Sequence, residues 1–574
     1  MTGASVPPSP MGEPPKRWLV MLRYEDVFGR RPTRDNLAEF IRKLPCANVV
    51  VKCTAIAFLS WRFGSEEKKH QAGLLANLLQ RVPTYAKTIE TLLADKSMPR
   101  VLFTAETLLA MARIAIVEGS DGDPKLTENS WADNFLRAAL AVNGFNSDEL
   151  LPKEMRHSAQ DLIASELRSA LARVDNPHIV YGRTEAFFAW AGGAAKAHPD
   201  YIDLDADLKS ISGIDHEEYA GSAYALWART AQAKTLDEML ALGVAFDTDK
   251  WLAKVKDSRA PRAWLQAASV EIETIRKEWK DEPSLSYAGA GLLYRYPVLI
   301  VDEGLRIAPS PALLANAMGD GIYFTLLNNY DEERKGKLSR FYGAFFEDYV
   351  ASIFERGYAP RGAFFRRGVE YKKGVLSSDA FISDNEDVFF IEVVAKRMNL
   401  VRSILRLDAA QIQKDLEQGV LKKMRQLHRN VADFRSGALF PNVKRVKGQR
   451  VFPILVSPKA FPRIYVIANI VKEAQEKDGL LKDAEPIEFL DVQEIEQLES
   501  EFIAGISLGD LLHRKNSSTL QKRFMTLNNY LIDEEPKTAT RGNLALKRGN
   551  AAARKLVDGI VTSWLGTTPG KAAE

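Results

Sequence analysis

The spacing of apolar residues changes along this chain, and that change constrains the fold more than any other feature of the sequence. Up to about residue 285, apolar residues recur every three or four positions, as in 102–117, 131–143 and 157–173. This spacing predicts amphipathic helices. The apolar run at 47–59 fits either a strand or a buried helix. From about 337 to 500, short apolar runs alternate with turns and helical stretches, which is typical of an α/β or α+β domain.

We therefore expect a multidomain α+β protein with five segments. Residues 1–16 hold five prolines and almost no bulky apolar residues, which predicts a disordered tail. A mainly helical N-terminal region follows over 17–285, and 286–336 form a connecting segment with one or two strands. The α/β domain spans 337–500, and residues 501–574 return to a helical pattern.

The expected elements of the α/β domain alternate along the chain. A helix at about 337–356 is followed by strand-like runs to about 396, and then by a long basic helical stretch. Further strands are predicted at 451–456 and near 486–491. Further helices are predicted near 463–477 and 492–500.

Composition excludes several classes of protein. The 78 Lys and Arg residues nearly balance the 75 Asp and Glu residues, so a nucleic-acid surface would have to be a local patch. The only cysteines, Cys46 and Cys53, exclude a disulfide framework and a zinc cluster of four thiolates. The N-terminus has no apolar stretch behind a basic start, and no run approaches the roughly 18 apolar residues of a membrane span. We therefore expect a soluble cytoplasmic protein that does not contact membranes.

Several familiar active-site motifs are absent. The sequence contains no GxxxxGK[ST] loop for nucleotide phosphates and no GxSxG nucleophile elbow. The GAG run at 289–291 lacks the third glycine of a dinucleotide fingerprint. His216 and Glu217 begin an HExxH zinc motif, but position 220 is Ala, so this motif fails as well.

The strongest candidate site lies in the stretch 374–397, GVLSSDAFISDNEDVFFIEVVAKR, which predicts a strand, a tight polar turn and a second strand. A symmetric hairpin here pairs residues whose numbers sum to 771, which places Phe381 opposite Phe390 and Asp379 opposite Glu392. Opposed side chains on one face lie about 4.5–5.5 Å apart at Cβ. Two carboxylates so close among apolar neighbours repel each other, and a divalent cation between them would remove the repulsion. The alternative is a solvent-exposed hairpin with two surface charges.

The helix before this hairpin offers a third carboxylate. One face of the helix at 343–355 carries an apolar stripe of Phe346, Val350, Ile353 and Phe354. At 100° per residue, Glu347 lies at the margin of that stripe, whereas Asp348 points away from it. Glu347 is thus placed to reach a site over the sheet, unless it is an ordinary surface acid.

This order of residues resembles the PD-(D/E)XK nuclease superfamily, which has the restriction-endonuclease-like fold. More narrowly, the chain resembles bacterial proteins in which a large helical N-terminal region precedes such a domain. The resemblance covers about 337–500 and rests on a helix acid, a strand Asp, a Glu near the end of the next strand, and a helix with Lys and Gln. It implies that Glu347 is the helix acid, Asp379 the motif aspartate and Glu392 the second metal-binding acid. The backbone carbonyl of Val393 would then be a further ligand of Mg²⁺ or Mn²⁺.

The sequence departs from the family pattern, Glu-x-Lys, because Val394 stands at the lysine position. In the family, that lysine positions the attacking water and stabilises charge on the phosphate. Lys396 lies on the same strand face as Glu392, since strand side chains alternate, with its Cα about 13 Å away. We assign the catalytic role to Lys396, and keep Lys422 and Lys423 of the next helix as candidates for a migrated lysine.

A basic run follows the acids. Residues 396–450 include 14 Lys or Arg and only 4 Asp or Glu. Cations of this kind contact phosphates and supply most of the non-specific affinity for nucleic acid. We expect a nucleic-acid surface formed by Lys422, Lys423, Arg425 and Gln426. The alternative is a solvated helix face.

The sequence therefore predicts a metal-dependent nuclease that cleaves phosphodiester bonds, with DNA as the expected substrate. Two alternatives stay open. Val394 would suit a catalytically silent, nuclease-like module that only binds nucleic acid. The helical N-terminal region would suit a scaffold that binds a protein partner.

Overall fold

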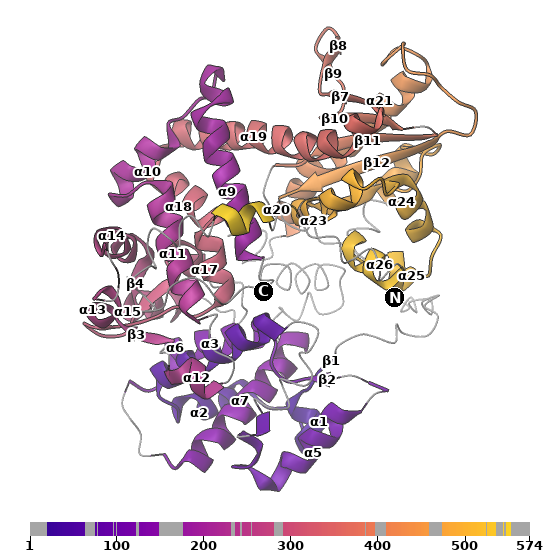
Figure 1. Cartoon of the computed structure of the whole chain (residues 1–574). Coiled ribbons are helices and arrows are strands. Elements are labelled where there is room, and N and C mark those ends of the chain that lie inside the picture. Colours follow the sequence, from indigo (N-terminus) through magenta and orange to yellow (C-terminus); the bar gives the residue numbers. More distant parts are fainter. Residues whose placement is uncertain are drawn as a thin grey trace. The chain divides into compact units, whose positions relative to one another are not determined.

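A computed structural model (Figure 1) describes residues 20–63, 75–76, 78–95, 97–98, 100–121, 126–148, 176–230, 236–241, 244–253, 255, 257–280, 291–384, 386–395, 409–458, 473–523, 525–534, 544 and 547–552. The chain divides into an N-terminal unit, residues 1–150, and a C-terminal unit, residues 151–574. The helical region expected over 17–285 is therefore shared between both units. The expected tail at 1–16, the helix at 157–173 and most of the helix at 463–477 lie outside the described residues.

The N-terminal unit is built around two apolar helices. α3 (Cys46–Phe63) packs against α6 (Ala105–Glu118), and both helices are buried on most sides. The ambiguous run at 47–59 is therefore part of a buried helix, which contains both free cysteines. Around this pair lie α1 (Tyr24–Phe28), α2 (Arg34–Arg42), α5 (Pro83–Ala94), α7 (Glu128–Asp148) and the parallel strands β1 (Val20–Met21) and β2 (Arg100–Val101).

The first part of the C-terminal unit combines helices with a small sheet. The sheet has the order β3-β6-β5-β4, with bounds Ala245–Asp247, Leu305–Ile307, Val298–Ile300 and Ser269–Glu271. The segment 286–336 contributes β5 and β6, so the strands expected there are confirmed. The helices of this part are α9 (Pro177–Gly192), α10 (Leu204–Ser212), α11 (His216–Thr230), α12 (Leu236–Ala241), α13 (Thr248–Leu252), α14 (Arg259–Ala268), α15 (Ile272–Lys280), α16 (Gly291–Arg295), α17 (Pro311–Ala317) and α18 (Asp320–Asn329).

One long helix, α19 (Glu332–Tyr358), joins these helices to a larger sheet. It begins after Asp331, whose side chain accepts a hydrogen bond from the Arg334 amide at 2.8 Å and so caps the helix. Tyr342 packs against Phe187 of α9, with ring centroids 5.2 Å apart. At its other end, Tyr358 packs against Phe389 of the larger sheet, at 5.9 Å. Figure 1 shows α19 running from α10 and α18 to β7.

The larger sheet has five strands in the order β7-β10-β11-β12-β13. Their bounds are Phe364–Arg367, Ala380–Asp384, Asp387–Val393, Arg450–Ser457 and Glu488–Asp491. β7, β10 and β11 pair antiparallel, whereas β11, β12 and β13 pair in parallel. Phe381 pairs with Phe390 and Ser383 with Val388, so the predicted register is confirmed. β12 and β13 also confirm the strands expected at 451–456 and 486–491.

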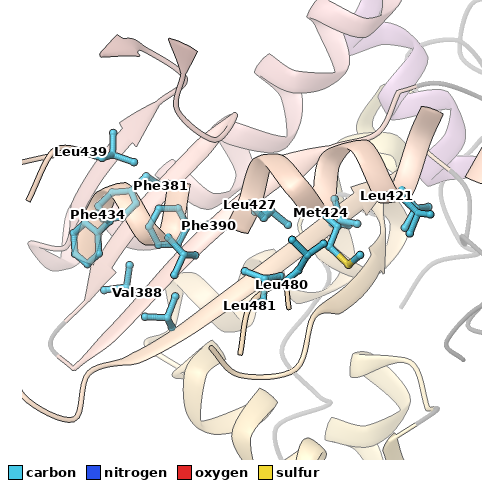
Figure 2. Packing of buried hydrophobic residues seen from close by; sticks show 14 of the residues in the cluster. Phe381, Val388, Phe390, Leu421, Met424, Leu427, Phe434, Leu439, Leu480 and Leu481 are labelled. Carbon is cyan, nitrogen blue, oxygen red and sulfur yellow. The ribbon is translucent and has the colours of Figure 1, made fainter. Parts of the chain in front are cut away.

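One continuous helix covers one face of this sheet. It comprises α20 (Ala409–Leu416), a π-helical turn (Glu417–Leu421) and α21 (Lys422–Arg435). Figure 2 shows Met424, Leu427 and Phe434 in one apolar cluster with Phe381 and Phe390 of the strands. The ring centroid of Phe434 lies 5.3 Å from that of Phe381 and 5.7 Å from that of Phe390. Each such buried side chain contributes about 1.5–3 kcal/mol, so this packing fixes α21 against the strands.

A further helix, α23 (Val492–Ile503), packs against α19. It carries two fully buried glutamates that bind arginines from distant parts of the unit. Glu496 accepts hydrogen bonds from the Arg183 guanidinium at 2.9 and 2.7 Å and from the Tyr349 hydroxyl at 2.7 Å. Glu499 binds Arg356, at 2.7 Å, and Arg548. The remaining helices are α24 (Leu508–Asn516), α25 (Leu520–Arg523) and α26 (Leu527–Glu534).

Helices thus dominate the described residues and are combined with parallel and antiparallel strands in two units, which makes this a multidomain α+β protein. None of the helices described is both long enough and apolar enough to cross a membrane.

Candidate active site

Two carboxylates and one lysine meet at the end of the sheet where β10 begins and β11 ends. Asp379 directly precedes β10, and Glu392 is the second-last residue of β11. The Lys423 ammonium group, from α21, donates hydrogen bonds to Glu392 Oε2 at 2.6 Å and to Asp379 Oδ2 at 3.2 Å. The Val393 amide donates to the same Asp379 oxygen at 2.7 Å. The two acids predicted from the hairpin register therefore share one site.

Strand alternation explains why both acids face α21. Side chains two residues apart on a strand point to the same face, and Phe390 lies two positions before Glu392. Phe381 lies two positions after Asp379. Both phenylalanines belong to the apolar cluster under α21. The face that packs on α21 therefore ends in the two carboxylates.

α21 also holds the segment that leads into Asp379. Gln426 donates to the Ser377 carbonyl at 3.5 Å, and Asn430 donates to the Ser378 hydroxyl at 3.0 Å. Lys423, Gln426 and Asn430 are spaced by three and four residues, so they lie on one helix face. Ser377, Ser378 and Asn430 are all buried. This row of contacts fixes the position of Asp379 relative to the lysine.

Glu392 is the most constrained group of the site. Its side chain is fully buried, and among the described residues its Oε1 atom has no hydrogen-bond partner. Burial, and next the charge of Asp379, raise the pKa of Glu392 well above its usual value, although Lys423 opposes this. Burial by itself lowers the pKa of Lys423, but Glu392 and Asp379 outweigh it and hold that pKa above its ordinary value. The lysine therefore stays charged, and it binds Glu392 through one of the two carboxyl oxygens.

Glu347 of α19 contributes the third acidic group. Its side chain remains open to solvent, yet the surrounding protein and then Asp379 raise its pKa to about 7, with Lys423 opposing them. Asp348 instead forms an ion pair with Arg367 and is 43% exposed. Glu347 is therefore close enough to Asp379 and Lys423 to respond to their charges, whereas Asp348, expected to be solvated, pairs with Arg367 of β7.

The valine at the family's lysine position belongs to the core. Val394 is 4% exposed and is a member of the apolar cluster under α21. A Cβ atom added to Gly419, in the π-helical turn, would lie 3.5 Å from Val394 Cγ1, so this turn packs on the valine. Lys396 lies outside the described residues. Among the described residues, Lys423 is the lysine that contacts both acids. It is one of the two lysines that the sequence leaves as candidates for a migrated lysine.

Many cations of the basic run are used inside the protein. Arg425 pairs with Glu417 and Asp478. Arg445 donates to backbone carbonyls, among them that of Leu439 at 2.8 Å. Lys422 is exposed and forms no ion pair within the described residues. Further cations that bind protein groups are Arg429, Arg435 and Arg450. The positive excess counted from the sequence therefore overstates the charge that faces solvent.

A second group of possible metal ligands lies elsewhere in the described residues. Glu185 of α9 and His216 and Glu217 of α11 offer ligand atoms within 4.8 Å of one another. The His216 ring stacks on Phe188 at 3.9 Å, and its Nδ1 atom lies 2.8 Å from Asp205 Oδ1. Burial opposes the charged form, but Asp205 and Glu185 raise the pKa of His216 to about 9. The sequence pattern missed this group because Glu185 comes from another helix. Charge pairing accounts for it without a metal.

Comparisons of the chain with protein-family models, with curated proteins and with solved structures gave no match.

Proposed function

We propose that residues 337–500 form a restriction-endonuclease-like domain and that the protein is a metal-dependent nuclease acting on DNA. Supporting this proposal are the contacts of Lys423 with Asp379 and Glu392, and the charge of Asp379 that acts on Glu347, in the chain order that the family resemblance implies. Glu347 comes from the long helix α19, Asp379 from the start of β10, and Glu392 from the end of β11. Lys423 supplies the cation from the following helix.

The observation that carries the proposal is the incomplete pairing of Glu392. A buried carboxylate oxygen without a partner costs roughly 1–3 kcal/mol or more. Here such an oxygen, Glu392 Oε1, lies beside a second carboxylate, Asp379. Oxygen donors of this kind suit Mg²⁺ or Mn²⁺. Asp379, Glu392 and the Val393 carbonyl would hold the ion.

When bound, the metal would lower the pKa of a coordinated water and neutralise charge on the scissile phosphate. The chain's own groups have complementary roles. Lys423 stays protonated between the acids, so it suits the stabilisation of negative charge on the phosphate. Glu347 has a pKa of about 7, so it suits the acceptance of a proton from water near neutral pH.

A catalytically silent module that only binds nucleic acid is the second candidate. It is favoured by the burial of Val394 and by the internal use of several cations. A lysine built at position 394 would have to replace a core side chain. Under this proposal Lys423 would act only as a structural counter-ion of the two acids.

A cleavage assay separates the two candidates. The full chain is incubated with labelled duplex DNA, single-stranded DNA and RNA, with Mg²⁺ or Mn²⁺, and compared with Asp379→Asn and a matched control, Asp384→Asn. Asp384 lies at the other end of β10, where it pairs with Arg361 at 3.2 Å. We expect the parent and Asp384→Asn to cleave DNA and Asp379→Asn to be inactive. A parent that binds DNA but cleaves nothing supports the silent module, and equal cleavage by all three proteins contradicts the proposed site.

A further inference from the structure

A small hairpin leaves the sheet at the end where the acids lie. It consists of β8 (Glu370–Lys372) and β9 (Val375–Leu376), which pair antiparallel. At its base, the Gly368 amide donates to the Asp379 carbonyl at 2.9 Å, and the Ser377 amide donates to the Val369 carbonyl at 2.8 Å. Figure 1 shows the hairpin projecting beyond the strands β7 and β10. We name residues 369–376 the arm.

One side of the arm is fixed to α21. The Tyr371 hydroxyl donates to Asp433 Oδ2 at 2.5 Å, and the Lys372 ammonium donates to Asp433 Oδ1 at 2.8 Å. Arg429 donates to the Leu376 carbonyl at 3.3 Å. Because α21 also binds Ser377, Ser378 and Asp379, the arm and the acids are held by the same helix. Its tip is therefore at a fixed distance from the candidate active site.

The exposed residues of the arm combine cations with apolar groups. The exposed tip contains Lys373, followed by Gly374, whose φ of +72° allows a tight turn. Leu376 is 56% exposed and Val369 39%, which makes them two of only five large apolar side chains exposed in the described parts of the chain. Exposed Arg366 and Lys422 lie on the adjoining β7 and α21.

The arm has one acidic residue, Glu370, which is exposed and is the register partner of Leu376. Glu370 accepts a hydrogen bond from the Gly374 amide at 2.7 Å, within the hairpin. Asp433 is occupied by Tyr371 and Lys372. A partner that approaches the tip meets the Lys373 ammonium group first, and further along the arm the exposed Leu376 side chain and the hydrogen-bonded Glu370 carboxylate.

We propose that the arm enters the major groove of duplex DNA next to the scissile phosphate. The major groove, about 12 Å wide, admits a two-stranded β-ribbon. Lys373 would contact phosphates, and Leu376 would contact apolar base edges such as the thymine methyl group. Duplex RNA has a deep, narrow major groove that excludes such a ribbon. This inference rests on the proposed function, because the arm would hold DNA over the acids.

The test compares two turns of nearly identical composition. Val446, Lys447 and Gly448 form an exposed turn before β12, in which Gly448 has a φ of +84°. β11 and β12 run in parallel, and Arg450 pairs with Asp387 whereas Leu455 pairs with Glu392. The control turn therefore lies at the sheet end opposite the acids. Arm variants are Lys373→Glu and Lys373→Glu/Leu376→Ser, and their controls are Lys447→Glu and Lys447→Glu/Val446→Ser.

Each variant is made in full-length Asp379→Asn protein, so that binding is measured without cleavage. Fluorescence anisotropy with a labelled 20-base-pair DNA duplex and the corresponding RNA duplex gives Kd over a range of salt concentrations. We expect Lys373→Glu to weaken DNA binding about tenfold and to reduce the slope of log K against log salt by about 0.9 or more. The double arm variant should bind still more weakly, the two controls should stay within about twofold, and RNA binding should change little.

Three outcomes would overturn the arm proposal: equal DNA affinity in arm and control variants, equal loss for DNA and RNA duplexes, or no duplex binding by the parent. The single variant Lys373→Glu alters only an exposed turn, so it stays informative if the double variant misfolds. The proposed function fails separately. If the parent does not cleave DNA but the arm variants lose DNA affinity, only the proposed function is wrong. If Asp379→Asn blocks cleavage but the arm variants bind DNA as tightly as the parent does, only the arm proposal is wrong.

Discussion

Buried glutamates occur at two places in the C-terminal unit, and their hydrogen bonding differs. Glu496 of α23 accepts three hydrogen bonds, from Arg183 and Tyr349, and Glu499 binds two arginines. Glu392 of β11 is equally buried, but it binds Lys423 through one oxygen while the other has no partner in the described residues. A fully paired buried acid stabilises a fold, whereas a half-paired one beside a second acid suits a ligand. The difference, rather than burial itself, points to the functional site.

The largest expected effect concerns Glu496, the fully paired glutamate, and the free energy of unfolding. Glu496→Gln removes the carboxylate that pairs with the Arg183 guanidinium, whose side chain is 13% exposed. Removal of one member of a buried ion pair typically costs 3–5 kcal/mol, and we expect about 3 kcal/mol because Gln still accepts one hydrogen bond. Urea unfolding followed by tryptophan fluorescence measures the change. An unchanged midpoint would mean that Glu496 does not act as a structural acid.

The second prediction concerns the cation of the candidate active site. Lys423→Met should lower the DNA cleavage rate about 10²–10³-fold, the usual effect of removing one group that stabilises charge in the transition state. Lys447→Met is the matched control, because Lys447 is exposed in the turn before β12, at the sheet end opposite the acids. We expect this control to keep its cleavage rate. Equal rates for both variants would exclude Lys423 as the migrated lysine.

The third prediction makes the same Glu→Gln substitution at the candidate active site. Glu392→Gln replaces a buried carboxyl group whose pKa is raised, and Lys423 keeps Asp379 as a partner, so we expect the free energy of unfolding to change by less than about 1 kcal/mol. Binding of Mn²⁺, measured by calorimetry, should be lost. A destabilisation as large as that of Glu496→Gln would remove the distinction between the two sites, and retained Mn²⁺ affinity would exclude Glu392 as a ligand.

The smallest effect is a pH dependence from Glu347. Its pKa is raised to about 7 in the folded chain but is about 4.3 in an unfolded chain. The folded state therefore binds this proton more tightly, and stability present below about pH 4.3 is lost as the pH rises to about 7. The side chain is open to solvent, so we expect the loss to stay below about 1 kcal/mol.

Urea midpoints at pH 5 and pH 8 measure this dependence without metal. Glu347→Gln should show a smaller difference between the two pH values than the parent does. Asp348→Asn, one residue further along α19, should behave like the parent. If the urea midpoint changes between pH 5 and pH 8 by the same amount in Glu347→Gln as in the parent, Asp379 does not raise the pKa of Glu347 in solution.

The sequence was most informative where a short pattern determines geometry. The hairpin register follows from the polar turn and the apolar runs on either side, so Phe381 and Phe390 were paired correctly and the two acids were placed together. In contrast, no local pattern decides how a basic residue is used. Arg425 and Arg445 were counted toward a nucleic-acid surface, but their partners come from other segments or from backbone carbonyls.

Long-range packing also decided the features that sequence left open. The run at 47–59 is a helix because it packs against α6, a segment far away in the sequence. The division of the chain at residue 150 depends on which helices share a core, and periodicity carries no information on this point. Glu185 joins His216 and Glu217 for the same reason.

The π-helical turn at Glu417–Leu421 has a consequence for insertions and deletions. A π turn takes up one residue more than a regular α-helical turn, so the helices on either side keep their directions. If the same residues were wound as a regular α-helix, α21 would rotate by about 100° relative to α20 and turn Lys423 away from the acids. Loss of one residue within 417–421 should therefore be tolerated, whereas loss of one residue within α21 should not. The choice between Lys422 and Lys423 is thus set by how many residues the preceding turn takes up relative to a regular α-helical turn.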